Sequence, residues 1–172
     1  MQVAHERTFN WTDFREVARG MAGRPHLEWM QAMIAGEIPP PPLGSAFEFA
    51  FETAEPGRVT FSVAAHEWAA NPAGVVHGGF ISTLLDTVLT LCVQTKLPQD
   101  RLATTTDLHV RFVRPATPNG QRLRAEATAV HIGSTMATAE GRVYDAAGKM
   151  VAHGTTALAI IAFPGASDAG RR

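Results

Sequence analysis

Residues 71–79 combine polar side chains with a pair of glycines directly before an apolar segment. They read Asn-Pro-Ala-Gly-Val-Val-His-Gly-Gly. We expect a helix to begin here, so that the N–H groups of Gly78 and Gly79 lie at the positive end of its dipole without a partner inside the helix. Such donors can stabilise an oxygen that gains negative charge. A glycine pair alone is more typical of a tight turn, but Asn71 and His77 beside it favour the catalytic interpretation.

A carboxylate, Asp86, follows His77 by nine residues. Its neighbours are apolar: Leu84, Leu85, Val88 and Leu89. A carboxylate close to a core costs several kcal/mol unless it is paired or hydrogen-bonded. A structural acid that is bonded to Ser82, to Thr90 or to a partner chain is one explanation, and a catalytic group is the other. The motif that precedes Asp86 favours the catalytic group.

The chain before this motif divides into a helical and an extended part. Apolar residues three and four apart predict a helix over residues 11–35, interrupted near Gly23-Arg24-Pro25. The four prolines at 39–42 predict a stiff extended linker. We therefore expect an N-terminal helical flap and linker (1–38), a main domain (39–163) and a disordered tail (164–172). Three aromatic residues are expected to pack the flap onto the domain: Trp11, Phe14 and Trp29.

The main domain shows the patterns of one helix and several strands. Alternation predicts strands around Phe47–Phe51 and Val59–Val63, joined by a turn at Glu55-Pro56-Gly57. A long, mostly buried helix is predicted over residues 80–95. Four further strands are predicted at 104–114, 123–132, 135–144 and 149–162. Because no helices alternate with these strands, we expect the α+β class, with an antiparallel sheet and one helix packed on one face.

Composition narrows the range of partners. The formal net charge is −1 without a basic block, which argues against nucleic acid as a partner. Only 18% of the residues are charged, against about 25% in typical domains, which favours an oligomer. Polar residues interrupt the most apolar stretch, 80–93, so no membrane span is expected. A single cysteine and a polar start predict a cytoplasmic protein.

These motifs resemble a known family. The pattern Asn71-Pro72-x-Gly74-x-x-His77-Gly78-Gly79-x6-Asp86, followed by Thr-Thr-Asp-Leu-His-Val-Arg-Phe-Val-Arg-Pro-Ala at 105–116, closely resembles the hotdog-fold acyl-CoA thioesterases of the PaaI-like type. The resemblance covers about residues 35–162. It implies a long central helix wrapped by an antiparallel sheet. It also implies sheets that pair edge to edge into a homodimer, and dimers that pair into a homotetramer.

The resemblance implies a role for each site residue in hydrolysis of an acyl-CoA to free acid and CoA. The Gly78 N–H and the Asn71 amide would hold the thioester carbonyl. Asp86 would act either as a general base on water or as a nucleophile. His77 would orient its neighbours or assist the departing thiolate, and Thr105 would hold the water or the carboxylate. Asp86 is expected to face the His77–Gly78 loop of another subunit.

Substrate binding is expected to involve Gly79, Arg111, Arg114 and Ser134. Gly133-Ser134 stands where many relatives carry Gly-Arg, so the CoA phosphates would be held by hydroxyl groups or by arginines at 111, 114 or 122. No metal or other cofactor is expected.

Two rival functions remain open. A hotdog dehydratase or hydratase would need a His-x-x-Pro-x-His-x-Asp stretch, which the sequence lacks. A non-catalytic acyl-CoA-binding protein would be expected to lose the carboxylate at Asp86. Cys92 is interpreted as a buried apolar residue, and His109, His131 and His153 as surface positions on successive strands.

Overall fold

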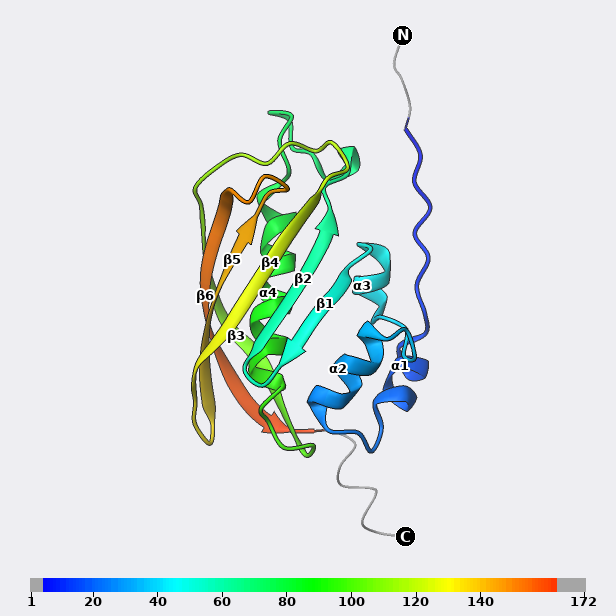
Figure 1. The fold of residues 1–172 in the computed structure, drawn as a ribbon, viewed down its shortest axis with the longest axis vertical. Helices are drawn as coiled ribbons and strands as arrows, with labels where there is room; N and C mark the ends of the chain where they lie inside the picture. The colour runs from blue at the N-terminus through cyan, green and yellow to red at the C-terminus, as the bar shows by residue number, and fades with distance from the viewer. Residues whose placement is uncertain (1–4, 164–172) are drawn as a thin grey trace.

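The computed structural model describes residues 5–163, so the tail expected over 164–172 lies outside the described residues. Six antiparallel strands form one sheet in the order β1-β2-β4-β5-β6-β3. Their bounds are β1 Ala50–Glu55, β2 Arg58–Ala64, β3 Arg101–Phe112, β4 Arg122–Ile132, β5 Met136–Tyr144 and β6 Met150–Ala162. The sheet curves around one long helix, α4 (Gly78–Gln94) (Figure 1). This is the α+β arrangement that the sequence predicts.

Helix α4 is buried against the concave face of the sheet. Its apolar side carries Leu84, Leu85, Val88, Leu89 and Cys92, all fully buried. The central strands face it with small residues, including Ala125, Ala127, Ala137, Ala139, Gly141 and Gly154. A Cβ on Gly141 would lie 3.0 Å from the Glu126 carbonyl oxygen and 3.2 Å from Leu89 Cδ2. The helix therefore packs so closely on the sheet that its position is fixed. Within residues 5–163 no helix is long and apolar enough to cross a membrane.

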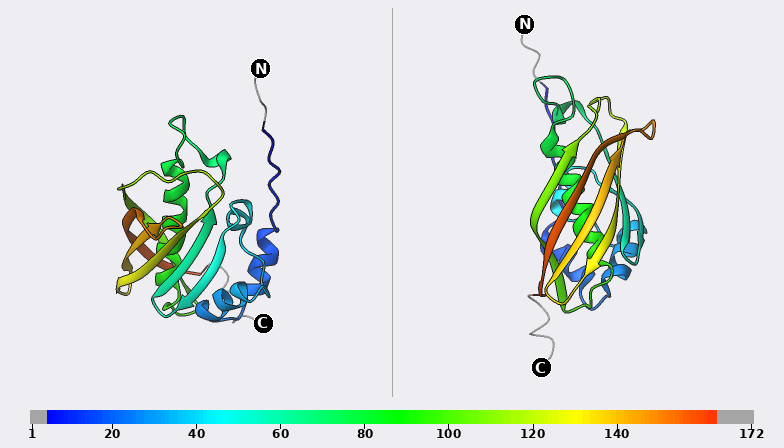
Figure 2. Two further views of the ribbon diagram at one scale, coloured as in Figure 1. Left: turned by 45° about the horizontal axis from the view of Figure 1, so that its top comes forward. Right: turned by 90° about the vertical axis from the view of Figure 1, so that its left-hand side faces the viewer.

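Three short helices precede the sheet and lie on the β1 side of the molecule (Figures 1 and 2). They are α1 (Phe14–Met21), α2 (His26–Ile34) and α3 (Pro42–Ala46), and the break between α1 and α2 falls at the predicted place. Helix α2 packs against β1. The Trp29 indole N–H donates to His26 Nδ1, and His26 Nε2 lies 2.8 Å from the Arg101 carbonyl oxygen. This buried contact fastens α2 to the start of β3.

The structure corrects three expectations in this region. Pro42 begins α3 instead of extending the linker, because a proline without an N–H group suits the first position of a helix. The first strand begins at Ala50 rather than Phe47, since Phe47 caps α3 and Glu48 adopts a positive φ of 57°. Of the three aromatic residues expected to pack the flap, only Trp29 is buried. Trp11 and Phe14 are exposed.

Candidate active site

The N-terminus of α4 carries a backbone N–H group that is free to bind a ligand. His77 is the N-cap, and its Nδ1 accepts a hydrogen bond from the Gly79 N–H at 2.9 Å. In a neutral imidazole the proton then resides on Nε2. Among the described residues the Gly78 N–H has no hydrogen-bond acceptor, as expected at the first position of a helix. The predicted pair of donors is therefore reduced to Gly78, because His77 occupies the N–H of Gly79.

A cavity of about 360 Å³, the Gly78 cavity, lies beside this N–H group. Asn71, Phe112 and Arg114 contribute to its lining. The Asn71 side-chain oxygen accepts the backbone N–H groups of residues 73 and 75, so its NH2 group is the part that can face a ligand. The Phe112 ring covers Gly78 closely, since a Cβ on Gly78 would lie 3.0 Å from Phe112 Cζ. Phe112 is 52% exposed in the single chain.

Asp86 lies in a second cavity, the Asp86 cavity, of about 420 Å³. The Thr105 hydroxyl donates to Asp86 Oδ1 at 2.8 Å, and the Thr90 and Thr105 hydroxyl oxygens are 3.0 Å apart. If Thr105 donates to the carboxylate, then Thr90 donates to Thr105, and the three groups form one chain of hydrogen bonds. The carboxylate is half-buried, with one oxygen fixed by this chain. The arrangement suits an acid that must remain oriented and reachable.

Thr90 was absent from the predicted set of catalytic residues. It stands four residues after Asp86, which places both side chains on one face of α4. The spacing of Thr90 from Asp86 was therefore the signal that pointed to it. The structure shows that the Thr90 hydroxyl does not bond to Asp86 directly. It bonds to Thr105, which in turn bonds to the carboxylate.

The two cavities do not meet within one chain. Gly78 and Asp86 are eight residues apart on the same helix, which separates them by about 12 Å along its axis. One thioester carbonyl cannot contact both groups from a single copy. The structure thus brings Asn71, Gly78 and Arg114 together in one place, and Asp86 and Thr105 in another.

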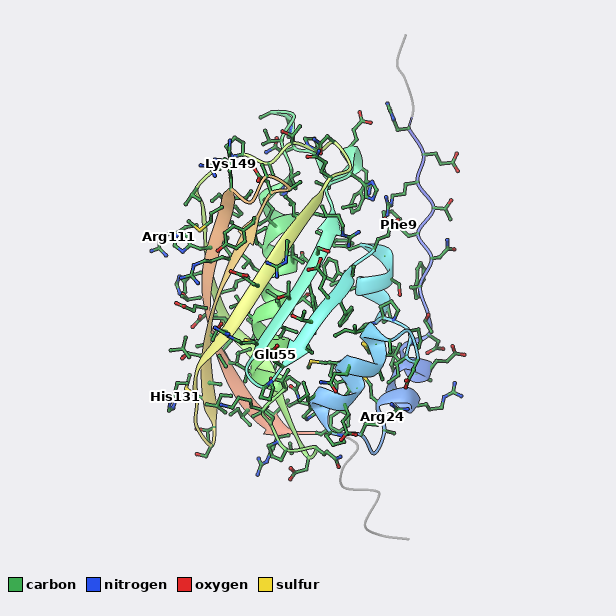
Figure 3. All side chains as sticks on the ribbon, viewed as in Figure 1. Phe9, Arg24, Glu55, Arg111, His131 and Lys149 are labelled. Atoms are coloured by element: carbon green, nitrogen blue, oxygen red, sulfur yellow. The ribbon has the colours of Figure 1, made fainter. Side chains whose placement is uncertain are left out.

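Two of the other expected substrate-binding residues, Arg111 and Ser134, lie outside both cavities. Arg111 is exposed on β3, opposite His153 of β6, and extends away from the sheet (Figure 3). Ser134 is exposed in the turn between β4 and β5. Arg114 is partly engaged, since its guanidinium donates to the Met150 carbonyl oxygen at 2.9 Å.

The remaining reactive side chains have structural explanations. Cys92 is fully buried, and burial raises the pKa of its thiol to about 12, so it is inert as a nucleophile. His109 and His131 are exposed as expected, and His153 is half-buried. Within the described part of the chain, no three His, Cys, Asp or Glu side chains are grouped as metal ligands would be.

The chain is similar to known proteins in sequence and in fold. Residues 73–152 match the family model of the thioesterase superfamily. A phenylacetic acid degradation-related protein of Ralstonia eutropha JMP134 has a solved structure that superposes with a TM-score of 0.69 at 26% identity, over 76% of this chain and 98% of that one. The chain has the hotdog fold.

One further protein is similar to the chain in fold and another in sequence. The E. coli PaaI protein of the phenylacetic acid degradation operon has the same fold, with a TM-score of 0.69 at 20% identity over 80% of this chain and 95% of that one. A protein of Halobacterium salinarum with the provisional name of an esterase is 38% identical over 94 residues, or 52% of this chain. The alignment spans 60% of that relative's length. The match of residues 73–152 to the thioesterase superfamily supports, in general terms, a hydrolase that acts on thioesters.

Proposed function

We propose that this hotdog protein hydrolyses acyl-CoA thioesters to a free acid and CoA. The observation that carries the proposal is Asp86, which is fixed by Thr105 and exposed to an apolar cavity. The unoccupied N–H group of Gly78 supplies the complementary donor. Protein smu.793 of Streptococcus mutans UA159, 23% identical with a TM-score of 0.61 over 66% of this chain and 89% of that one, was solved bound to acetyl-CoA. That complex supports CoA thioesters as the substrate class.

The site is completed by a second copy of the chain. β3 is an outer strand of the sheet, so it can pair with β3 of another copy. An antiparallel pairing about a two-fold axis near Leu108 places Phe112 opposite residue 104 of the other strand. Phe112 covers Gly78, and Thr105 holds Asp86. Such a dimer therefore brings the Gly78 N–H of one protomer toward the partner subunit's Asp86.

In this dimer the residues divide the chemistry between them. The Gly78 N–H and the Asn71 NH2 group stabilise the oxyanion that forms when the thioester carbon is attacked. Asp86 either removes a proton from the attacking water or attacks directly to form an anhydride that water then opens. Collapse of the tetrahedral intermediate breaks the C–S bond and releases CoA thiolate, near the Nε2–H of His77.

Arg111, Arg114 and Ser134 are the proposed contacts for the CoA phosphates. Arg114 is the best placed of the three, because it lines the Gly78 cavity directly. In the dimer this arginine would lie on the route by which the CoA part of the substrate leaves the site. Gly79 contributes shape only, since its N–H is already bonded to His77.

Subunit mixing tests both the reaction and the shared site. The variants Asp86→Asn and Gly78→Val are each expected to lose thiol release from acyl-CoA. After joint unfolding and refolding, each heterodimer contains one intact and one doubly defective site, so the mixture recovers about a quarter of the wild-type activity. No recovery from a mixture that light scattering shows to be dimeric or tetrameric would refute the shared site. Absence of thiol release by the wild type on any acyl-CoA would refute the reaction.

A further inference from the structure

The Asp86 cavity is built where the two outer strands of the sheet approach each other across α4. Strand β1 and the segment before it supply Phe51 and Phe49, and β3 supplies Ala103, Thr104 and Thr105. Helix α4 forms the floor, with Asp86, Thr87, Thr90 and Leu91. The remaining wall comes from α3 and the proline before it: Pro41, Leu43 and Gly44. The N-terminal segment therefore forms part of the cavity that contains the carboxylate.

We propose that this cavity binds the acyl chain of the substrate, and that Leu43 of α3 restricts the enzyme to apolar, uncharged acyl groups. This inference rests on the proposed thioesterase function and specifies its substrate class. The chain would extend from the thioester carbon near Asp86 toward Leu43. Dicarboxylic acyl groups such as glutaryl are rejected.

The chemistry of the lining supports an apolar occupant. Apart from the carboxylate and the hydroxyl groups near it, the cavity is lined by apolar side chains: Pro41, Leu43, Phe49, Phe51, Leu91 and Ala103. No lysine or arginine is among its lining residues in the described part of the chain. A second carboxylate in the substrate would thus lose its hydration near Asp86 and gain no cation in return. A volume of about 420 Å³ also falls in the range of pockets for small ligands.

Leu43 is held in a rigid frame, although its side chain is about half exposed. The Ser45 hydroxyl donates to the Pro40 carbonyl oxygen at 3.1 Å, and the Phe49 N–H donates to the Gly44 carbonyl oxygen at 2.8 Å. The ring of Phe47, which ends α3, stacks on Phe80 of α4 at 5.2 Å. Leu43 therefore keeps a defined place at the rim of the cavity, where an acyl chain can cover it.

The test compares kcat/KM for acetyl-, hexanoyl- and glutaryl-CoA by release of the CoA thiol. Each buried CH2 group contributes roughly a fourfold preference, so the wild type should favour hexanoyl over acetyl at least tenfold and over glutaryl by more. Leu43→Lys places a cation at the rim, and should lower hexanoyl hydrolysis while raising glutaryl hydrolysis, a change of at least tenfold in their ratio. Ile34→Lys is the matched control, because Ile34 is an exposed apolar residue on α2 outside the cavity.

Binding of S-hexyl-CoA, a thioether that cannot be hydrolysed, gives an independent readout by calorimetry. Weaker binding to Leu43→Lys, with unchanged binding to Ile34→Lys, supports the acyl cavity. It does so even if the protein hydrolyses no thioester, because absence of hydrolysis would refute only the proposed reaction. Thioester hydrolysis with the same chain preference in wild type and Leu43→Lys would overturn the acyl-cavity inference and leave the proposed reaction standing.

Discussion

Replacing Asp86 by asparagine separates a catalytic carboxylate from a structural one. The amide has nearly the shape of the carboxylate, and its oxygen can accept the same hydrogen bond from Thr105. What the change removes is the negative charge, together with basicity and nucleophilicity. Loss of a positioned general base lowers kcat by about 10²–10⁴. We expect a loss in this range on every acyl-CoA that the wild type hydrolyses.

The effect of Asp86→Asn on stability is expected to be small. A hydrogen bond to a charged group contributes about 1.5–3 kcal/mol and one between neutral groups about 0.5–1.5 kcal/mol. The difference, about 1 kcal/mol, is offset in part because the half-buried carboxylate no longer pays for desolvation. For a chain of this size, 1 kcal/mol corresponds to about 2–4 °C in Tm. The variant should therefore remain folded and melt within a few degrees of the wild type.

The assay combines thiol release, a melting curve and titration of the S-hexyl-CoA thioether. Asp100→Asn is the matched control, because Asp100 is an exposed carboxylate paired only loosely with Arg101 at 3.9 Å. The control should retain both activity and stability. The reasoning is refuted if folded Asp86→Asn protein hydrolyses thioesters at the wild-type rate, or if it loses more than about 10 °C in Tm.

Three further predictions concern single side chains. Gly78→Ala should fold, because the Phe112 ring needs only a small shift to admit the new Cβ. The Cβ would enter the Gly78 cavity and hinder the approach of the thioester carbonyl to the N–H group, which should lower kcat/KM by about 10²-fold; unchanged kcat/KM would show that the substrate does not approach Gly78. Thr90→Val should lower kcat and alter its pH profile, whereas Thr83→Val, which loses only a bond to a helix carbonyl, should leave both unchanged; equal effects would contradict the hydrogen-bond chain. Cys92, with a pKa of about 12, should resist iodoacetamide at pH 8 in native protein and react once urea unfolds it, and rapid labelling in the folded state would disprove its burial.

The positions of the strands and of the long helix along the chain could be predicted because their signals are local. Alternation along β2 and β4–β6 and the apolar positions of α4 locate these elements to within three residues. Local signals failed where the aromatic alternation of Phe47, Phe49 and Phe51 continued across a helix end and a residue with positive φ. The fixed φ of Pro42 likewise agrees with both a linker and the first turn of a helix. Whether Pro42 lies in a linker or in a helix depends on tertiary packing, which cannot be deduced from the local sequence.

The candidate site likewise has features that the sequence predicts and features that it does not. The types and spacing of His77, Gly78 and Asp86 could be recognised, since they lie on one helix and its cap. The hydrogen bond from the Gly79 N–H to His77, which competes with a ligand for that donor, could not be predicted from the sequence. It depends on the rotamer of one imidazole. The link from Thr90 through Thr105 joins two elements whose register is set only by the folded sheet.

The close fit of α4 against small residues on the sheet constrains how this protein can change. A side chain at Gly141 would press on Leu89 of the helix that carries Gly78 and Asp86, and one at Gly154 would press on the His109 carbonyl oxygen of β3. Helix α3 contacts the Asp86 cavity without supporting α4 from the sheet side. If the proposed function holds, substitutions in α3 are the ones that can change the substrate without moving Gly78 or Asp86.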